Sequence, residues 1–426
     1  MRLWDIEPNR VPESRREHDR VPTPAAAGWS PFGRAGRGLG AWRVRTTPRL
    51  RPDPGAVPDG PVREVDVLVI GAGQAGLATA YHLQRAGFSG HAPVRGRHAL
   101  PSTDGTYLVL DDQDGPGGSW QHRWNSLTMA TVNHIHALPG APVPDVDPGL
   151  PARRAVTSYF TDYEDRFDLA VLRPIRVFDV SPMDDDPGGR LLVSTSGGRW
   201  AARVVVGASG TWNRPFWPYV PGWDTFLGRQ LHTRDYRGPR EFTRSRVVVV
   251  GGGLSAVSHL MELSEVAKTT WCTRREPEFR TTPFDAQAGY EVEQAVRWRA
   301  ERGLRPQSVV SRTGLLLTPE IAAARESGVL RRREMFVAIE PYGVRWADGT
   351  FREADHILWA TGFRPDLPYL TNLRLHTKQG GITMVGTQVA DHPRLHLVGL
   401  GPDSSTVGAR RSARLAVDAI ERRLHG

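Results

Sequence analysis

One segment near residue 70 constrains the fold more than any other part of the chain. Residues 65–76 read VDVLVIGAGQAG, an aliphatic run that ends in the pattern Gly71-x-Gly73-x-x-Gly76. An unbroken aliphatic run is typical of a strand buried on both faces of a parallel sheet. Gly71 permits a tight turn, Gly73 lets the backbone approach a diphosphate, and Gly76 lets the next helix pack closely. The segment therefore predicts a dinucleotide-binding strand–loop–helix unit.

An acidic residue follows at the position that such a unit requires. We expect a helix over about 75–86, closed by Gly87, and a second strand over 107–110 that ends at Asp111. Asp111 is expected to accept hydrogen bonds from the adenosine ribose, with Asp112 as the alternative, and Gln74 is counted with the loop. The spacing of 35 positions from Gly76 to Asp111 (111 − 76) exceeds the usual spacing of about 20. Residues 88–106 are therefore expected to form an inserted loop.

A second unit of the same kind begins 180 residues further on (251 − 71). Residues 246–256 read RVVVVGGGLSA, which contains Gly251-x-Gly253-x-x-Ala256 and Ser255. Alanine is an accepted variant of the third glycine, because its methyl group still permits close packing. The helix that follows is expected to place Val257, Leu260, Met261 and Leu263 in the core.

The second unit lacks an acidic residue after its second strand. Arg274 and Arg275 stand there instead. An arginine at this place favours the 2′-phosphate of NADP over the free ribose of NAD. The alternative is that the two arginines only solvate the end of a strand.

The duplicated unit predicts the fold class, an α/β protein with two Rossmann-like dinucleotide-binding domains, the second inserted in the first. Further strands are expected at residues 336–339, 344–346, 356–360 and 395–398, and a final amphipathic helix at 409–423. Residues 1–62 are rich in Arg, Pro and Gly, so we expect that segment to be disordered.

Composition excludes several other classes of protein. The net charge of +9 comes almost entirely from arginine, but the arginines are scattered and no zinc-finger spacing accompanies them, so we expect no nucleic-acid partner and no metal site. No run approaches the roughly 18 apolar residues of a membrane span, and no signal core follows Met1. The expected location is cytoplasmic, without a membrane partner. The single cysteine, Cys272, excludes a redox-active cysteine pair, and it is expected to be buried in a strand.

A third motif lies between the two glycine loops. Residues 226–236 read FLGRQLHTRDY and match F-x-G-x-x-x-H-x-x-x-(F/Y), the fingerprint of the flavin-containing monooxygenases. Over about 65–426 the chain resembles that family. Further matches are GGSW at 117–120, GASG at 207–210, ATGFRP at 360–365 and LVGLG at 397–401.

The resemblance implies two cofactors, FAD and NADPH, and a division of the chain. It implies a FAD-binding domain over 63–215 and 356–426 and an NADPH-binding domain over 216–355. It also assigns roles to single residues. Gly118, Trp120, Gly362 and Gly399 would join the cofactor-binding residues, while His232, Tyr236 and Asn125 are the candidate catalytic residues.

The implied activity is that of a flavoprotein oxidoreductase. NADPH would reduce the flavin, a C4a-hydroperoxyflavin would form with O₂, and one oxygen atom would pass to an amine nitrogen or a sulfide of a small molecule. Tyr236-Arg237 stand where Baeyer–Villiger monooxygenases carry Trp, which favours heteroatom oxidation. The alternatives are a Baeyer–Villiger monooxygenase, an NAD(P)H-dependent flavin dehydrogenase or oxidase, and a nucleotide-binding regulatory protein.

The substrate is open at this point, and so is the oligomeric state, with a homodimer as one option. Aromatic residues of segment 276–335 are expected to help form the substrate pocket or the domain interface, although aromatics are more often core; they are Phe279, Phe284, Tyr290 and Trp298. We predict that deletion of the 88–106 insert preserves flavin binding.

Overall fold

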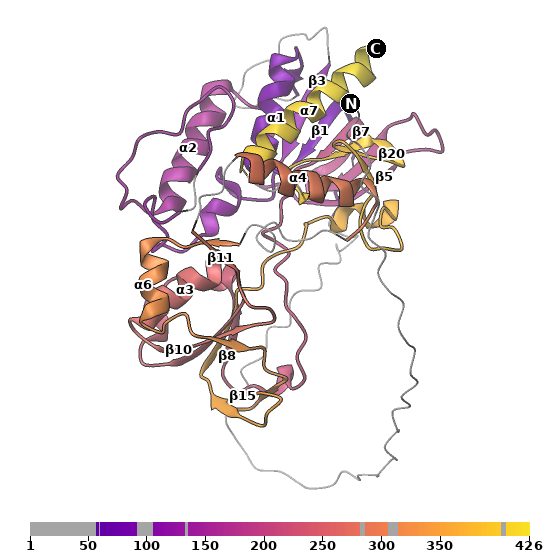
Figure 1. Cartoon of the computed structure of the whole chain (residues 1–426). Coiled ribbons are helices and arrows are strands. Elements are labelled where there is room, and N and C mark those ends of the chain that lie inside the picture. The colour runs from indigo at the N-terminus through magenta and orange to yellow at the C-terminus, as the bar shows by residue number, and fades with distance from the viewer. Residues whose placement is uncertain are drawn as a thin grey trace, which may run out of the picture. The chain divides into compact units, whose positions relative to one another are not determined.

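The computed structural model describes residues 57–58, 60–91, 105–132, 135–281, 286–305, 314–401 and 406–426 (Figure 1). The segment expected to be disordered, 1–62, lies outside the described residues apart from 57–58 and 60–62.

The first sheet is centred on β1 (Arg63–Ile70), which follows directly from the aliphatic run in the sequence. β1 pairs in parallel with β3 (Thr106–Leu110) on one side and with β7 (Gly198–Gly207) on the other. β7 in turn pairs in parallel with β20 (His392–Leu397). The sheet runs in the order β18-β19-β20-β7-β1-β3-β2, so neighbouring strands are brought together from distant parts of the chain.

Both faces of β1 are buried, as the sequence predicts. Val67 and Val69 pack into a core with α1 (Gln74–Arg85) and α7 (Thr406–His425). These two helices lie side by side over that face (Figure 1). Leu68, on the opposite face, packs into a second core with residues of β5 (Val177–Pro182), β6 (Leu191–Thr195) and η6 (Pro368–Leu373).

The rest of this part of the chain surrounds that sheet. Its elements are β2 (Ser89–Gly90), η2 (Gly118–His122), α2 (Ala152–Phe167), β4 (Val171–Leu172), β5 (Val177–Pro182), β6 (Leu191–Thr195), η6 (Pro368–Leu373), β18 (Met384–Val385) and β19 (Gln388–Val389). β5 and β6 form an antiparallel hairpin that continues into β7.

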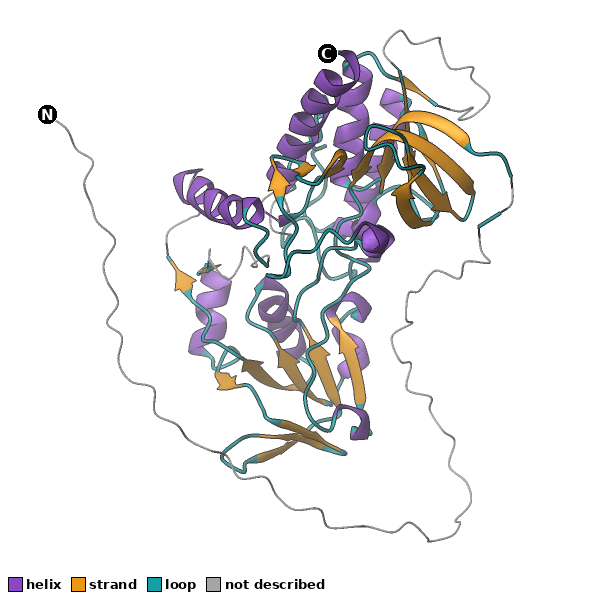
Figure 2. Cartoon of the chain, turned by 90° about the vertical axis from the view of Figure 1, so that its right-hand side faces the viewer, coloured by secondary structure: helices purple, strands orange, loops and turns teal. Residues whose placement is uncertain are grey.

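The second sheet, in the lower half of Figure 2, is entirely parallel. Its strands run in the order β13-β10-β9-β17-β8. Its centre is β9 (Arg246–Val250), flanked by β10 (Lys268–Thr273) and β17 (His356–Trp359). Its strands all come from residues 229–359, so the chain leaves the first sheet after β7 and returns to it at β18. The structure thus confirms an α/β fold with Rossmann-like parallel sheets.

The other elements of this middle part are short, apart from the helices. They are η3 (Trp223–Thr225), β8 (Arg229–His232), η4 (Thr233–Asp235), η5 (Pro239–Phe242), α3 (Leu254–Ser264), β11 (Phe279–Arg280), α4 (Ala286–Glu301), β12 (Leu315–Leu316), α6 (Pro319–Glu326), β13 (Arg332–Glu334), β14 (Ala338–Glu340), β15 (Gly343–Arg345) and β16 (Phe351–Glu353). In α3, Val257, Leu260 and Leu263 are buried and Met261 is partly buried against the same core.

One expectation about local structure is wrong. The segment 88–106 is not a loop throughout, because Ser89–Gly90 form β2 and pair in parallel with β3. Phe88, just before, is buried in the core of the first sheet. Residues 92–104 lie outside the described residues.

None of the helices in the described ranges is long and apolar enough to cross a membrane.

Candidate functional site

A cavity of about 290 Å³ lies where β1, β3 and β7 end. This is the low end of the roughly 300–1,000 Å³ that ligand pockets span, and ligands of open α/β sheets bind outside the carboxyl ends of the strands. Its wall is formed by the loop after β1, the end of β3, η2, the segment after β7, and the surroundings of Phe363 and Val398. Seven predicted cofactor-binding residues line it: Gly71, Gly73, Gln74, Asp111, Gly118, Trp120 and Gly399.

The loop after β1 brings the backbone to the cavity without side chains. Gly71 has a φ of +100°, and its N–H donates to the carbonyl of Leu110 at 2.7 Å. A Cβ on Gly76 would lie 1.8 Å from the carbonyl oxygen of Gly71, so only glycine permits this approach of helix to strand. A Cβ on Gly73 would meet nothing within 4 Å, which leaves room for a bound group beside the backbone.

The N-terminus of α1 opens onto this loop. Gly73 is its N-cap; no side chain of the described residues caps the helix, and no acidic residue lies in its first turn. The first N–H groups of a helix lack partners within the helix and carry a partial positive charge. They can therefore bind the phosphates of a dinucleotide.

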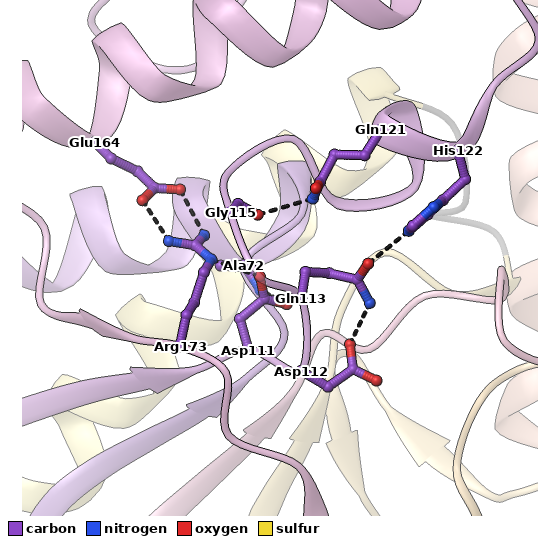
Figure 3. Close-up of polar contacts among 9 residues, drawn as sticks. All are labelled: Ala72, Asp111, Asp112, Gln113, Gly115, Gln121, His122, Glu164 and Arg173. Atoms are coloured by element: carbon purple, nitrogen blue, oxygen red, sulfur yellow. Dashed lines mark hydrogen bonds and ion pairs between the residues drawn. The ribbon is translucent and has the colours of Figure 1, made fainter.

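Asp111 is held by an ion-pair network at the end of β3 (Figure 3). Its Oδ2 accepts from Arg173 Nε at 2.7 Å, and its Oδ1 accepts from the backbone N–H of Ala72 at 3.3 Å. Arg173 also makes two bonds of 2.7 Å to Glu164. Burial lowers the pKa of Arg173, but the hydrogen bonds and charges of Glu164 and Asp111 outweigh that effect and raise it above its usual value.

Asp112 belongs to a second chain of contacts, which Figure 3 shows beside the first. Its carboxylate accepts from the amides of Gln113 at 2.5 Å and Asn213 at 3.3 Å. Gln113 in turn contacts His122 Nε2 at 2.5 Å. Burial, aided by the charges of Arg234 and Arg237, lowers the pKa of His122. Asp111 and Asp112 both line the cavity, so the geometry leaves both available to ribose hydroxyls.

Aromatic rings form another part of the cavity wall. Trp212 stacks on Phe363 at a centroid distance of 5.1 Å and on His122 at 6.1 Å. The guanidinium carbon of Arg123 lies 4.6 Å from the ring centre of Trp212 and 5.5 Å from that of Trp120. The wall is thus apolar and planar, with one cation against it.

The last strand of the first sheet closes the cavity from the other side. Gly399 has a φ of +67°, and its N–H donates to Ser412 Oγ at 3.3 Å. A Cβ here would lie 2.8 Å from the methyl group of Ala75 in the first turn of α1. A side chain at 399 would therefore crowd the start of α1.

The second glycine loop reproduces the first. Gly251 has a φ of +146°, and Gly253 is the N-cap of α3, again with no side-chain cap or first-turn acid in the described residues. Ala256 is fully buried, whereas Ser255 is half-buried. Arg274 and Arg275 follow β10 directly, and both are exposed.

His232 is enclosed rather than facing the cavity. It is 0% exposed, its Nδ1 accepts from the N–H of Arg234, and its Nε2 lies 3.0 Å from the carbonyl oxygen of Gly362. Because Nδ1 accepts, Nε2 carries the proton and donates to Gly362. Burial lowers the pKa of His232 to about 4. Its ring meets Phe363 edge-on at 4.9 Å, so His232 supports a residue of the cavity wall.

Tyr236, the last residue of the fingerprint, joins three segments. Its hydroxyl donates at 2.8 Å to Glu262 on α3. The same carboxylate accepts from Ser126 Oγ at 2.8 Å and from the indole of Trp124 at 3.3 Å. Glu262 therefore ties helix α3 to the segment that follows η2.

Asn125 lies beside this junction but points elsewhere. It is exposed, and its Oδ1 accepts from Arg153 at 3.3 Å. Asn125, His232 and Tyr236 are all absent from the described lining of the cavity.

The aromatic residues of 276–335 do not line this cavity in the described part of the chain. Phe279 packs against the core of the second sheet, and Trp298 is 50% exposed. Phe284, and the side chain of Tyr290, lie outside the described residues. No cluster of three or more potential metal-ligating residues occurs among the described residues.

Comparison with known proteins agrees with this architecture. A family model described as pyridine nucleotide-disulphide oxidoreductase matches residues 119–399. A solved structure of a doubly substituted flavin monooxygenase from Stenotrophomonas maltophilia is 35% identical with a TM-score of 0.69, and the match covers 85% of this chain and 99% of that one. This chain belongs to the pyridine nucleotide-disulphide oxidoreductase family that the model describes. Together with the match to the solved structure, this identifies the chain as a flavin-containing monooxygenase, which is an oxidoreductase.

More distant relatives include other monooxygenases. An uncharacterized CzcO-like oxidoreductase of Geobacillus kaustophilus is 25% identical over 72% of this chain and 82% of its own length. A protein of Arabidopsis thaliana, named as the probable indole-3-pyruvate monooxygenase YUCCA4, is 24% identical over 74% of this chain and 79% of its own.

Sequence reasoning missed several residues of the cavity. Arg123, Trp212 and Phe363 line it, and Arg173 holds Asp111 at its edge. Arg123 and Trp212 lie next to motifs that the sequence did reveal, so proximity to GGSW and GASG was the available signal. Arg173 offered none, because 62 residues separate it from Asp111.

Proposed function

We propose that this protein binds FAD in the cavity of the first sheet and NADPH at the second glycine loop. The supporting observation is that the cavity presents the bare loop Gly71–Gly76, the uncapped start of α1 and two carboxylates together. These groups suit a diphosphate and a ribose. The open space beside Gly73 and the cation of Arg123, whose Nε is buried, also fit an anionic cofactor.

The proposal includes a division of labour along the chain. Residues 63–215 and 356–426 would form the FAD-binding domain, and the inserted residues 216–355 would form the NADPH-binding domain. Arg274 and Arg275 lie at the end of β10, where they would bind the 2′-phosphate. In the second unit, Gly251, Gly253, Ser255 and Ala256 would hold the diphosphate of NADPH, as the first loop holds that of FAD.

When bound, FAD would accept a hydride from NADPH and pass the electrons to O₂, so that one oxygen atom reaches a small nucleophilic substrate and the other leaves as water. The protein's own residues orient the cofactors and exclude water. His232 fixes Gly362 and Phe363 at the cavity wall. Tyr236 and Glu262 connect α3 with the segment behind η2, which would keep the two cofactor sites in register.

The reaction is tested with the purified protein. Flavin released by heat should be FAD, and aerobic NADPH oxidation should yield an oxygenated product from amines or sulfides in a ratio near one to NADPH. Indole-3-pyruvate and simple ketones complete the panel, because one relative is named for the former. Hydrogen peroxide without any oxygenated product would identify an oxidase instead. Esters or lactones from the ketones would identify a Baeyer–Villiger monooxygenase.

A further inference from the structure

The guanidinium of Arg123 is a charged group without a partner. Arg123 ends η2, and its Nε is buried with no hydrogen-bond acceptor. Among the described residues, no side-chain hydrogen bond and no ion pair of Arg123 is found. The residue as a whole is half-buried, and Nε is the one atom of its side chain that is buried without a partner. A charge partly withdrawn from water is disfavoured unless a partner offsets it, which is why such charges in proteins are usually paired.

The aromatic neighbours of Arg123 do not neutralise it. The rings of Trp120 and Trp212 lie within 5.5 and 4.6 Å of the guanidinium carbon. Such contacts stabilise a cation less than a charge-assisted hydrogen bond to an anion does. The rings flank the guanidinium at the wall of the cavity but give Nε no hydrogen-bond acceptor.

The acidic residues of the cavity do not pair with Arg123, although both remain open to ribose hydroxyls. Asp111 pairs with Arg173, and Asp112 accepts from Gln113 and Asn213. Arg123 is the only lysine or arginine among the described residues that line the cavity. Burial lowers the pKa of Arg123 to about 10, so the side chain stays charged at neutral pH.

We propose that Arg123 binds an anionic group of the flavin cofactor in this cavity and is the cation that offsets its charge. The inference rests on the proposed FAD site. Two parts of the cofactor have this chemistry, the diphosphate and the ring of the reduced flavin. Gly118, at the start of η2, lies against the glycine loop, because an added Cβ would be 3.0 Å from Gly73 Cα. Arg123 comes five residues after Gly118, and a 3₁₀-helix rises about 2.0 Å per residue, so Arg123 lies about 10 Å from Gly118 along η2. This distance from the glycine loop favours the flavin ring over the diphosphate as the partner of Arg123.

The test compares Arg123→Met, Arg123→Lys and the control Arg154→Gln. Arg154 is exposed, lies on α2 and does not line the cavity, so its variant removes the same charge without touching the site. Dissociation constants of FAD are measured by titration of apoprotein, and reduction potentials by dye equilibration. A diphosphate partner predicts about 10- to 100-fold weaker FAD binding by Arg123→Met. A ring partner predicts a lower potential, by about 30 mV for each tenfold loss of preference for reduced flavin.

The stability of the apoprotein separates this role from a purely structural one. Removing a half-buried charge that has no anionic partner should leave apo Arg123→Met at least as stable as the wild-type apoprotein. With FAD bound the order should reverse, and Arg123→Lys should lie between the two because it keeps the charge without the planar fork.

The inference fails if Arg123→Met and Arg154→Gln have the same FAD affinity and the same reduction potential, and if FAD binding does not reverse the order of stability between Arg123→Met and the wild type. If the wild-type protein binds no FAD at all, the proposed function fails, and the role of Arg123 fails with it.

Discussion

The two glycine loops share one backbone arrangement, although they lie in different sheets. Gly71 donates its N–H to the end of β3, and Gly251 donates its N–H to the end of β10. A Cβ on Gly71 would lie 2.7 Å from the carbonyl oxygen of Ala208, and a Cβ on Gly251 would lie 2.2 Å from that of Ala360. In both units the first glycine is therefore required, because the residue that follows the neighbouring strand, β7 or β17, lies too close for a side chain.

The units differ at the third position and at the end of the next strand. Gly76 leaves no room for a methyl group, whereas Ala256 carries one in the fully buried core. After β3 comes buried Asp111, which pairs with Arg173 from the segment after β4, whereas after β10 come exposed Arg274 and Arg275. The loop backbone suits any dinucleotide diphosphate, so under the proposed function the side chains after the second strand would determine which dinucleotide each unit prefers.

The largest expected effect concerns the network that only the first unit possesses. Arg173→Gln would leave the buried carboxylates of Glu164 and Asp111 without their cation. Removing one partner of such a buried pair costs about 3–5 kcal/mol. The free energy of unfolding in urea should fall by that amount, and the bound flavin should be lost. Arg176→Gln, at an exposed arginine three residues away, is the control. A loss below about 1 kcal/mol for Arg173→Gln would show that the network does not support the first unit.

The next effect exchanges the third residue of the two loops. Gly76→Ala places a methyl group 1.8 Å from a backbone oxygen, so helix and strand must separate. Overpacking of this kind costs about 1–3 kcal/mol. Ala256→Gly should cost about 1 kcal/mol, mainly from the lower helix propensity of glycine. Unfolding curves of both variants test the order, and equal costs would mean that the two helices pack alike against their strands.

A third prediction concerns the arginines that only the second unit carries. Changing Arg274 and Arg275 to Ser should raise KM for NADPH about tenfold or more, because charge-assisted hydrogen bonds to the 2′-phosphate are lost. KM for NADH should stay within about twofold, and Arg331→Ser, at another exposed arginine, should change neither. If KM rises equally for NADPH and NADH, Arg274 and Arg275 do not select NADP and only solvate the end of β10.

Much of this comparison was predictable from sequence because its signals are local. β1, α1, β9 and α3 are each encoded in about ten consecutive residues. The structure places the ends of β1 and α1 within two residues of expectation, and β9 and α3 lie on either side of the second glycine loop, as its motif predicts. Cys272 is buried in β10, as its apolar neighbours suggest. The helix α2 was overlooked, although Val156, Phe160 and Tyr163 recur at helical spacing and are buried.

Other parts of the site depend on contacts that no local pattern announces. Arg173 reaches Asp111 only because β4 pairs with β3. Arg123 is one arginine in a chain rich in them, and only its burial beside Trp212 distinguishes it. The junction at Glu262 is similar, since its three donors come from two segments more than 100 residues apart. The fingerprint in the sequence indicated Tyr236 as a candidate, but no motif indicated Glu262, the carboxylate to which Tyr236 donates.

The last prediction concerns the pH dependence of stability and tests His259, a buried histidine on α3 beside the second sheet. His259 is 0% exposed, and burial, with the charges of His232 and Arg123 adding to it, lowers its pKa to about 3. The unfolded chain protonates near 6.5, so below that pH the unfolded state binds a proton that the native state does not, and stability falls toward acid. The slope contributed by one such histidine is about 1.4 kcal/mol per pH unit. His259→Leu should remove that slope between pH 6.5 and about 4. Thr233→Val, which removes only the hydrogen-bond partner of His259 at 3.2 Å, should keep it. If His259→Leu retains the wild-type slope, His259 is already protonated in the native state. The surroundings of His259 would then be more open to water than its 0% exposure indicates.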